Sequence, residues 1–175
     1  MGDPRRLTKK YSGPKHPWRA NRIAEESQLV IEYGLKNKTE IWKASSELTH
    51  MQQQAKKLTA SRGKQSEKET AQFMERLSRI ALAKEGRKLV DVLSLTTKDI
   101  LERRLQTQLV RKGMAKTMDQ ARQFIIHGHV TVKGKKVTRP SYQVTVIEES
   151  MIGFVPTSAV ASADHPARQI EVKKK

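Results

Sequence analysis

The chain of 175 residues contains no cysteine, few aromatic residues and no long apolar segment. The absence of cysteine excludes disulfides, thiolate zinc sites and a thiol nucleophile. Hydrophobic residues make up 36% of the chain and aromatic residues 5%, so we expect a modest core. No run of 18 apolar residues is present, so no membrane-spanning helix is expected. Residues 1–20 are basic and lack an apolar stretch, which predicts a cytosolic protein without a secretory signal.

Acidic residues are also scarce. The chain has 18 Asp and Glu against 35 Lys and Arg, which gives a formal net charge of +17. Such an excess of cations argues for a polyanionic partner. A basic surface by itself fits both phosphodiesters and anionic lipid headgroups, so composition alone leaves both classes of partner open.

The cations are unevenly distributed along the chain. Residues 1–22 contain seven cations and one anion, and residues 101–147 contain ten cations and two anions. Residues 23–100 are nearly balanced, with fourteen cations and eleven anions. We therefore expect two basic contact surfaces on either side of a helical scaffold.

Residues 1–20 combine Pro, Gly and basic residues without helical periodicity, so they are expected to form an extended arm. A disordered basic tail is the alternative. Trp18 favours an ordered arm, because an indole usually lies against a surface or a base. The candidate RNA-contacting residues of this first block are Arg5, Arg6, Lys9, Lys10, Lys15, Trp18, Arg19 and Arg22.

Residues 21–95 are predicted to form a helical domain. Helices are expected over 21–34 and over 39–58, the second with Thr39 as its N-cap. A loop over 59–66 would end at a capping box that starts at Ser66, and the third helix would run to Gly86. The apolar stripes are expected to pack as an ordinary helical core, and they contain Ile41, Ala44, Leu48, Met51, Ala55, Leu58, Phe73 and Leu77.

Residues 96–149 are predicted to form a separate α-then-β module, and residues 150–175 a C-terminal tail. Thr96 and Asp99 open one helix, which Gly113 ends. Thr117 caps a second, shorter helix, which Gly128 ends, so the two helices form an αα-hairpin.

Strands are expected after this helical hairpin. Residues 129–132 and 135–137 alternate on either side of Lys133-Gly134, which predicts a β-hairpin. Tyr142, Val144 and Val146 alternate again and are expected to form a returning strand. The fold class is therefore α+β, with a basic arm, a helical domain and a small αα-hairpin/β-hairpin domain.

The polar residues of this module are expected to point outward and to cluster around the hairpin and the helix ends. Cations this dense repel one another unless an anion such as phosphate lies among them. A solvated basic face without a function is the alternative. His127 and His129 lack a third ligand of the right type nearby, so no metal site is expected. The candidate RNA-contacting residues are Arg103, Arg104, Arg122, Gln123, His127, His129, Thr131, Lys133, Lys135, Lys136, Arg139 and Tyr142.

This module contains the motifs Leu-Glu-Arg-Arg-Leu-Gln-Thr (101–107), Lys-Gly-Met-Ala (112–115), Gln-Ala-Arg-Gln-Phe-Ile-Ile-His-Gly-His-Val (120–130), Val-Lys-Gly-Lys (132–135) and Pro-Ser-Tyr (140–142). Together these motifs closely resemble the S-four-type RNA-binding domain. The first half of the chain, with Tyr-Gly-Leu-Lys-Asn-Lys at 33–38, resembles the helical region of the small-subunit ribosomal protein S-four family in its archaeal and eukaryotic form. Many members of the domain family have asparagine before the hairpin glycine, where this chain has Lys133, so the turn type stays open.

The resemblance implies a structural, cytoplasmic ribosomal protein that binds small-subunit rRNA early in assembly, at a multi-helix junction in the 5′ region. It also implies a place near the site where mRNA enters, beside the proteins S-three and S-five, with no membrane, cofactor or small-molecule substrate. The alternatives are the RNA-binding module of an RNA-modifying enzyme and a free RNA chaperone. The residues that the resemblance marks as RNA-contacting are Arg103, Arg104, Arg122, Gln123, His127, His129 and Lys133.

Overall fold

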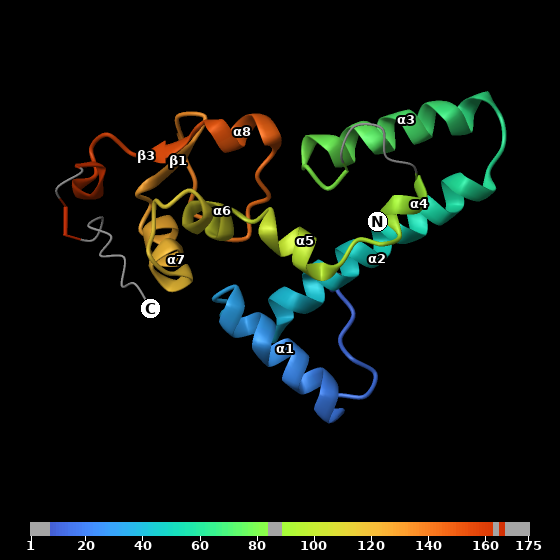
Figure 1. Ribbon diagram of the computed structural model, residues 1–175, viewed down its shortest axis with the longest axis horizontal. Coiled ribbons are helices and arrows are strands. Elements are labelled where there is room, and N and C mark those ends of the chain that lie inside the picture. Colours follow the sequence, from blue (N-terminus) through green and yellow to red (C-terminus); the bar gives the residue numbers. More distant parts are fainter. Residues whose placement is uncertain (1–7, 84–88, 163–164, 167–175) are drawn as a thin grey trace, which may run out of the picture.

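The computed structural model describes residues 8–83, 89–162 and 165–166, so Arg5, Arg6 and Gly86 lie outside the described residues. The fold is α+β, as predicted, with many helices and one small sheet (Figure 1). Among the described residues, no helix is long and apolar enough to cross a membrane. The elements are α1 (Ala20–Glu32), α2 (Lys38–Ala60), α3 (Lys64–Arg79), α4 (Leu89–Val92), α5 (Thr97–Glu102), α6 (Leu105–Arg111), α7 (Met118–Ile126), β1 (Val130–Val132), β2 (Lys135–Lys136), α8 (Val146–Ser150), β3 (Ile152–Phe154) and a 3-10 helix at Ala159–Ala161.

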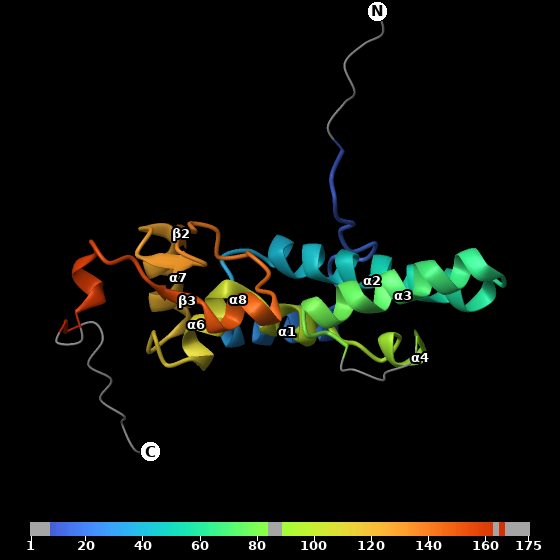
Figure 2. The same ribbon diagram turned by 90° about the horizontal axis from the view of Figure 1, so that it is seen from above.

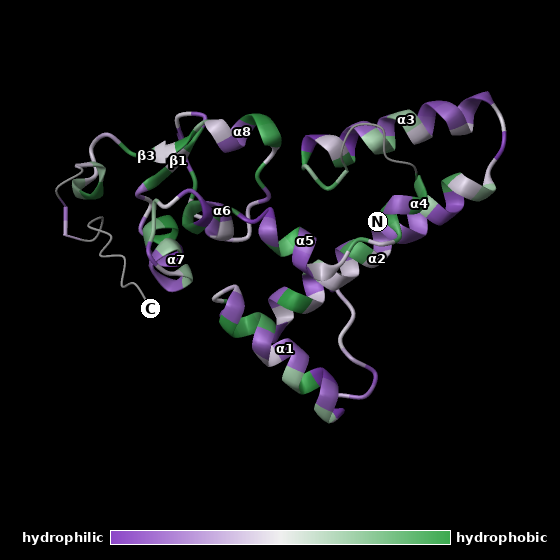
Figure 3. Cartoon of the chain, viewed as in Figure 1, coloured by the Kyte–Doolittle hydropathy of each residue, from purple (hydrophilic) through white to green (hydrophobic). Residues whose placement is uncertain are grey.

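Two apolar cores hold these elements together. The first core joins α1 to α5 and contains the inner faces of α2 and α3. The second core joins α6, α7 and the sheet, with Leu105, Leu109 and Ile125 fully buried. Figure 3 shows apolar and polar segments alternating along α2 and α3, as expected for helices that bury one face only. The boundary between the cores falls between Leu101 and Leu105.

The predicted apolar stripe of α2 is confirmed, because all six of its residues are buried. The helix ends differ from the prediction. Asn37 rather than Thr39 occupies the N-cap of α2. The next helix begins at Lys64, and the Ser66 hydroxyl donates to the carbonyl of Ser61 instead of capping. It ends at Arg79, because Ala81 takes a φ of +58°.

The helix predicted to start at Thr96 is in fact two helices. Its capping box with Asp99 is present, but the backbone leaves the helix at Arg104, which has a φ of −72° and a ψ of 142°. There the chain pairs with the returning segment, since the Leu105 N–H donates to the Tyr142 carbonyl at 2.8 Å. A single continuous helix was therefore the wrong prediction, because tertiary pairing overrides the local period at this point.

The β-hairpin is confirmed. Strands β1 and β2 are antiparallel, with Val132 opposite Lys135, and Lys133 and Gly134 form a two-residue turn. Both turn residues have positive φ, +52° and +74°, as a type I′ turn requires. Lys133 thus adopts a left-handed conformation in which asparagine is the more common residue.

The returning strand was predicted wrongly. Val146 begins helix α8, because Thr145 and Glu148 form a capping box in front of it. The third strand is β3, whose Phe154 lies opposite Val130, and the sheet order is β2-β1-β3. The chain beyond residue 149 therefore completes the sheet, and it also contributes the buried Val160 to the second core.

Gly34, which lies between α1 and α2, packs against the start of α7, so this position shows how tightly the two cores fit. Its φ is +54°, and a Cβ at this position would lie 2.5 Å from the Met118 Cβ. Gly113 has a φ of +69° but open space around it. We expect Gly34→Ala to lower the free energy of unfolding by about 2–4 kcal/mol and Gly113→Ala by about 1–2 kcal/mol. Urea unfolding followed by circular dichroism measures both, and equal losses would contradict the tight fit.

Candidate nucleic-acid interface

Exposed cations gather on the β1–β2 hairpin. Lys133, Lys135 and Lys136 project from the turn and from β2 into solvent. The Lys136 side chain passes over Gly128, because a Cβ added to this glycine would lie 1.9 Å from the Lys136 Cε. The ammonium group thereby approaches the C-terminus of α7, where the helix dipole favours a cation. Gln123, His127 and Arg139 are exposed as well.

Three other candidate RNA-contacting residues of this module form hydrogen bonds within the chain. The Thr131 hydroxyl donates to the Gly153 carbonyl at 3.2 Å, and the Tyr142 hydroxyl donates to Glu148 at 3.0 Å. The His129 Nδ1 lies 2.7 Å from the Ser158 hydroxyl, while the exposed His127 ring lies parallel to the His129 ring at 6.1 Å. RNA contacts from these residues stay predictions.

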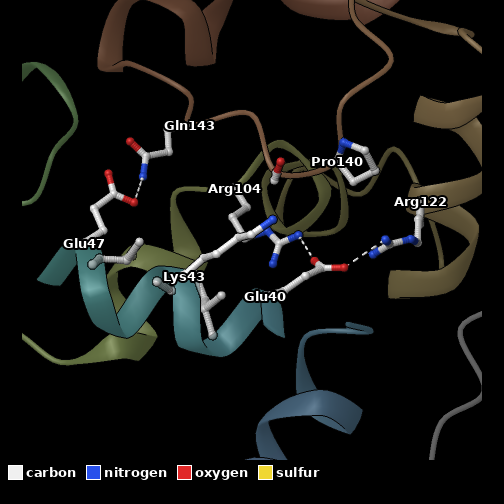
Figure 4. A pocket seen from close by; sticks show the side chains of 11 residues that line it. Glu40, Lys43, Glu47, Arg104, Arg122, Pro140 and Gln143 are labelled. Carbon is white, nitrogen blue, oxygen red and sulfur yellow. Dashed lines mark hydrogen bonds and ion pairs between the residues drawn. The ribbon is translucent and has the colours of Figure 1, made fainter. Parts of the chain in front are cut away.

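Glu40 of α2 bridges two of the predicted arginines (Figure 4). Its carboxylate accepts a hydrogen bond from Arg104 and a second one from Arg122, the latter at 3.0 Å. Arg104 has only 5% of its surface exposed, and Arg122 is half-buried. The bridge therefore ties the helical region to the hairpin module through charges that water screens poorly.

The expected outward placement of Arg103 and Arg104 is wrong. Arg103 donates to Glu149 at 2.9 Å and to the Val144 carbonyl at 3.1 Å, and its side chain is largely buried. Arg104 pairs with Glu40, as described above. Both guanidinium groups are committed to partners within the chain because the α5–α6 break turns them inward. We leave both out of the surface that we propose for RNA.

Sequence reasoning missed the amide of Gln106 and the carboxylate of Glu40. The Gln106 side chain is buried and donates to the carbonyls of Gly34 and Met118, at 3.0 and 2.9 Å. Glu40 lies four residues before the buried Ala44, on the edge of the apolar stripe, and this position was the signal that could have marked it. No comparable signal marks Gln106.

The described part of the arm lies along α2. The backbone N–H of Ser12 donates to the Ser46 hydroxyl at 3.1 Å, and the Tyr11 ring lies 6.3 Å from the Trp42 ring. Trp18 is 89% exposed, so its indole packs against little of the described part of the chain. The cations at positions 9, 10, 15 and 19 are exposed, whereas Arg22 pairs with Glu26 at 2.8 Å. Figure 2 shows the arm and the β1–β2 hairpin on the same side of the molecule.

The carboxylates in this interface are held in their charged form. Burial raises the pKa of Glu40, but the hydrogen bonds and charges of Arg104 and Arg122 outweigh it, and the net pKa lies below 4.5. The hydrogen bond from Arg111 is the largest cause that lowers the pKa of Glu102. The pKa values of Glu26 and Glu148 are lowered too, because hydrogen bonds to their carboxylates outweigh the effect of burial.

These shifts predict that the fold is sensitive to acid. A carboxyl whose pKa is lower in the folded chain stabilises the fold above its unfolded pKa, and this contribution disappears as the pH falls through the folded pKa. We expect a constant free energy of unfolding above about pH 5 and a steady decline below about pH 4.5. Urea titrations between pH 7 and pH 3 measure it, and an unchanged midpoint at the acid end would contradict the assignment.

Comparisons with known proteins extend over both cores. A family model described as the S4 domain matches residues 103–149. The chain is 51% identical to "Small ribosomal subunit protein uS4" of Methanococcus aeolicus over 174 residues, which cover 99% of this chain and 98% of that protein. Proteins of the same name from Halobacterium salinarum and Nanoarchaeum equitans are 51% and 48% identical, and each match covers at least 95% of both chains. The similarity thus reaches far beyond the residues that the family model matches.

Proposed function

Because this chain belongs to the uS4 family of small ribosomal subunit proteins, we propose that it is a structural constituent of that subunit and binds its rRNA directly. The observation that carries the proposal is the set of exposed lysines on the β1–β2 hairpin, on the same side as the basic arm. The curated relatives are ribosomal proteins and not enzymes, and they match the chain almost end to end. An RNA-modifying enzyme that carries this module is therefore not favoured.

We also propose a role in assembly. The hairpin and the arm would contact different RNA segments, and the protein would favour the junction geometry that satisfies both. Folded RNA is recognised mainly through backbone shape and 2′-hydroxyls, which suits lysines on a rigid turn. The cytoplasmic ribosome is the proposed location. A binding site in the 5′ region of the rRNA, neighbours S-three and S-five, and a place near the incoming mRNA rest on the family resemblance.

Within this function we assign Trp18 a part in base stacking. Its indole is exposed and lies between Lys15 and Arg19 in the sequence, an arrangement on which an unpaired base could stack. Lys9, Lys10, Lys15 and Arg19 would hold the phosphates on either side of that base. Arg5 and Arg6 remain candidates from the sequence.

The salt dependence of RNA binding tests the proposed function. If about ten phosphates are neutralised, the logarithm of affinity falls against the logarithm of salt concentration with a slope of about −7 to −9. Filter binding of the whole chain to a transcript of small-subunit rRNA between 0.1 and 0.5 M KCl measures the slope. A slope near zero would contradict direct electrostatic binding. Loss of the protein from small subunits at moderate salt in sucrose gradients would instead favour a free RNA chaperone.

A further inference from the structure

Helix α8 points its polar residues inward and its apolar residues outward, which is the reverse of the usual arrangement in a surface helix. Glu148 is buried and accepts a hydrogen bond from the Tyr142 hydroxyl at 3.0 Å, and Glu149 pairs with the largely buried Arg103 at 2.9 Å. These contacts fix the side of the helix that faces solvent. The side chains on that side have half or more of their surface exposed and belong to neither apolar core; they are Val146, Ile147 and Met151.

The segment around α8 also lacks cations. Residues 140–167 contain no Lys or Arg, and no other stretch of the chain without these residues is as long. A surface that neutralises RNA phosphates needs Lys or Arg, whereas α8 carries two carboxylates. An anionic bilayer needs cations beside the apolar face as well. In a chain with a net charge of +17, this face therefore fits neither RNA nor an anionic membrane.

The same face fits a protein that is itself cationic. Two cationic proteins repel each other where their basic surfaces meet, so they approach most easily where one of them has no cations. Apolar side chains of such a partner would cover the outward residues of α8. Its Lys or Arg side chains would lie near Glu149, whose side chain keeps 38% of its surface exposed.

The position of α8 suggests how such a partner is held. The helix lies next to the β1–β2 turn, because Glu148 pairs with Lys133 at 3.2 Å, and it lies beside α3 (Figure 1). A stable interface buries about 800 Å² per partner, which is more than three half-exposed side chains supply. A second copy of this chain, with the same net charge, would therefore not stay bound. A protein bound to the same RNA would, because its contact with α8 becomes intramolecular.

We propose that the outer face of α8, formed by Val146, Ile147 and Met151, is a docking site for a second protein of the small subunit. The partner is a cationic protein that binds the same RNA and covers this face with apolar side chains. The proposal rests on the proposed function, since it assumes that the chain is part of the subunit. It assigns the cation-free segment to protein contact, while the β1–β2 hairpin contacts RNA.

Site-specific crosslinking identifies what covers α8. Because the chain has no cysteine, a benzophenone maleimide reacts only at the cysteine of an Ile147→Cys variant. The tagged, labelled chain is assembled with the rRNA and the total small-subunit proteins of Methanococcus aeolicus, and the particles are isolated on a sucrose gradient. We expect crosslinks to a peptide of one other protein of the subunit. The same label on a Lys135→Cys variant, on the hairpin, is expected to crosslink to rRNA.

The other outcomes each have a defined meaning. Crosslinks from position 147 to rRNA, or to a peptide of this chain, would overturn the docking site. No crosslink from position 147 would overturn it as well, provided that position 135 crosslinks to rRNA in the same particles. If the unlabelled chain is absent from the particles, the proposed function fails instead.

An α8 variant with Val146→Ser, Ile147→Ser and Met151→Ser tests the contribution of this face to incorporation. When the variant and the unaltered chain compete for the same particles, we expect the unaltered chain to be enriched by at least about 10-fold, since the variant loses three apolar contacts. Affinity for a transcript of small-subunit rRNA alone should change by less than about twofold, because no cation is removed. The urea midpoint should change little, since these side chains are exposed.

The matched control removes exposed apolar side chains elsewhere. A variant with Ile31→Ser, Val90→Ser and Leu93→Ser, on α1 and around α4, should compete with the unaltered chain within about twofold. If the α8 variant is less stable than the control, Ile147→Ser alone replaces it, with an expected enrichment of the unaltered chain of about 2- to 4-fold. Equal incorporation of the α8 variant and the unaltered chain would overturn the docking site.

Discussion

Glu40→Gln is expected to lower the free energy of unfolding by about 3 kcal/mol. Removing one partner of a buried ion pair costs about 3–5 kcal/mol, because the remaining charge stays buried without compensation. Here two guanidinium groups lose the same partner, Arg104 with 6% and Arg122 with 20% of the side chain exposed. The Glu40 side chain keeps 18% of its surface exposed, which places the effect near the lower end of that range.

Glu75→Gln is the matched control for this experiment. Glu75 pairs with Arg79 on the outer face of α3 at 2.6 Å, with more than 60% of both side chains exposed. An exposed pair of this kind contributes less than about 1 kcal/mol. Urea unfolding at pH 7 compares the two variants with the unaltered chain. Glu40→Gln should also flatten the acid-dependent part of the stability curve, and a Glu40→Gln variant as stable as the control would refute the bridge.

The bridge has a functional consequence as well. It fixes the hairpin module against α2, and the basic arm lies along α2 as well. Two RNA-binding surfaces at a fixed distance turn the second contact into an intramolecular event, which raises affinity without a new contact. The buried amide of Gln106 and the close approach at Gly34 hold the same junction. The contacts that fix the two cores against each other are therefore expected to contribute to RNA affinity as well as to stability.

The sequence predicted those elements that depend on neighbouring residues alone. The apolar residues of α2 recur with the helical period, which places them on one buried face, and the β-hairpin follows from Lys133-Gly134 between two alternating segments. Thr96 and Asp99 were predicted to open a helix for the same reason, and in the structure they form its capping box. A capping box at Thr145 and Glu148 was equally visible, and it would have corrected the strand predicted through Val146.

The remaining features depend on partners far apart in the sequence. Glu40 and Arg104 are separated by 64 positions, and no period along the chain connects them. The three residues of β3 include Gly153 and show no alternation of buried and exposed positions, so only pairing with β1 defines them as a strand. The candidate site differs from the prediction for this reason. The predicted hairpin lysines are exposed, whereas Arg103 and Arg104 point inward and pair with Glu149 and Glu40, which the count of charges along the chain did not connect with them.

The largest loss of RNA binding is expected from the hairpin. A variant with Lys133→Ala, Lys135→Ala and Lys136→Ala should bind the rRNA transcript about 150- to 2,000-fold more weakly at 0.15 M KCl, because each lysine–phosphate contact contributes about 1–1.5 kcal/mol. The salt slope should shrink by about 2–3. These side chains are exposed, so the midpoint of urea unfolding should change little.

A control variant with Lys56→Ala, Lys57→Ala and Arg62→Ala separates this loss from a general effect of net charge, since both variants remove three exposed cations. Of the three lysines, Lys133 alone has an ion-pair partner among the described residues, Glu148 at 3.2 Å, and Lys133→Ala by itself reports how much that pair contributes to stability. A hairpin variant that binds like the control, with an unchanged slope, would mean that the lysines face solvent in the complex. Binding would then have to come from the arm.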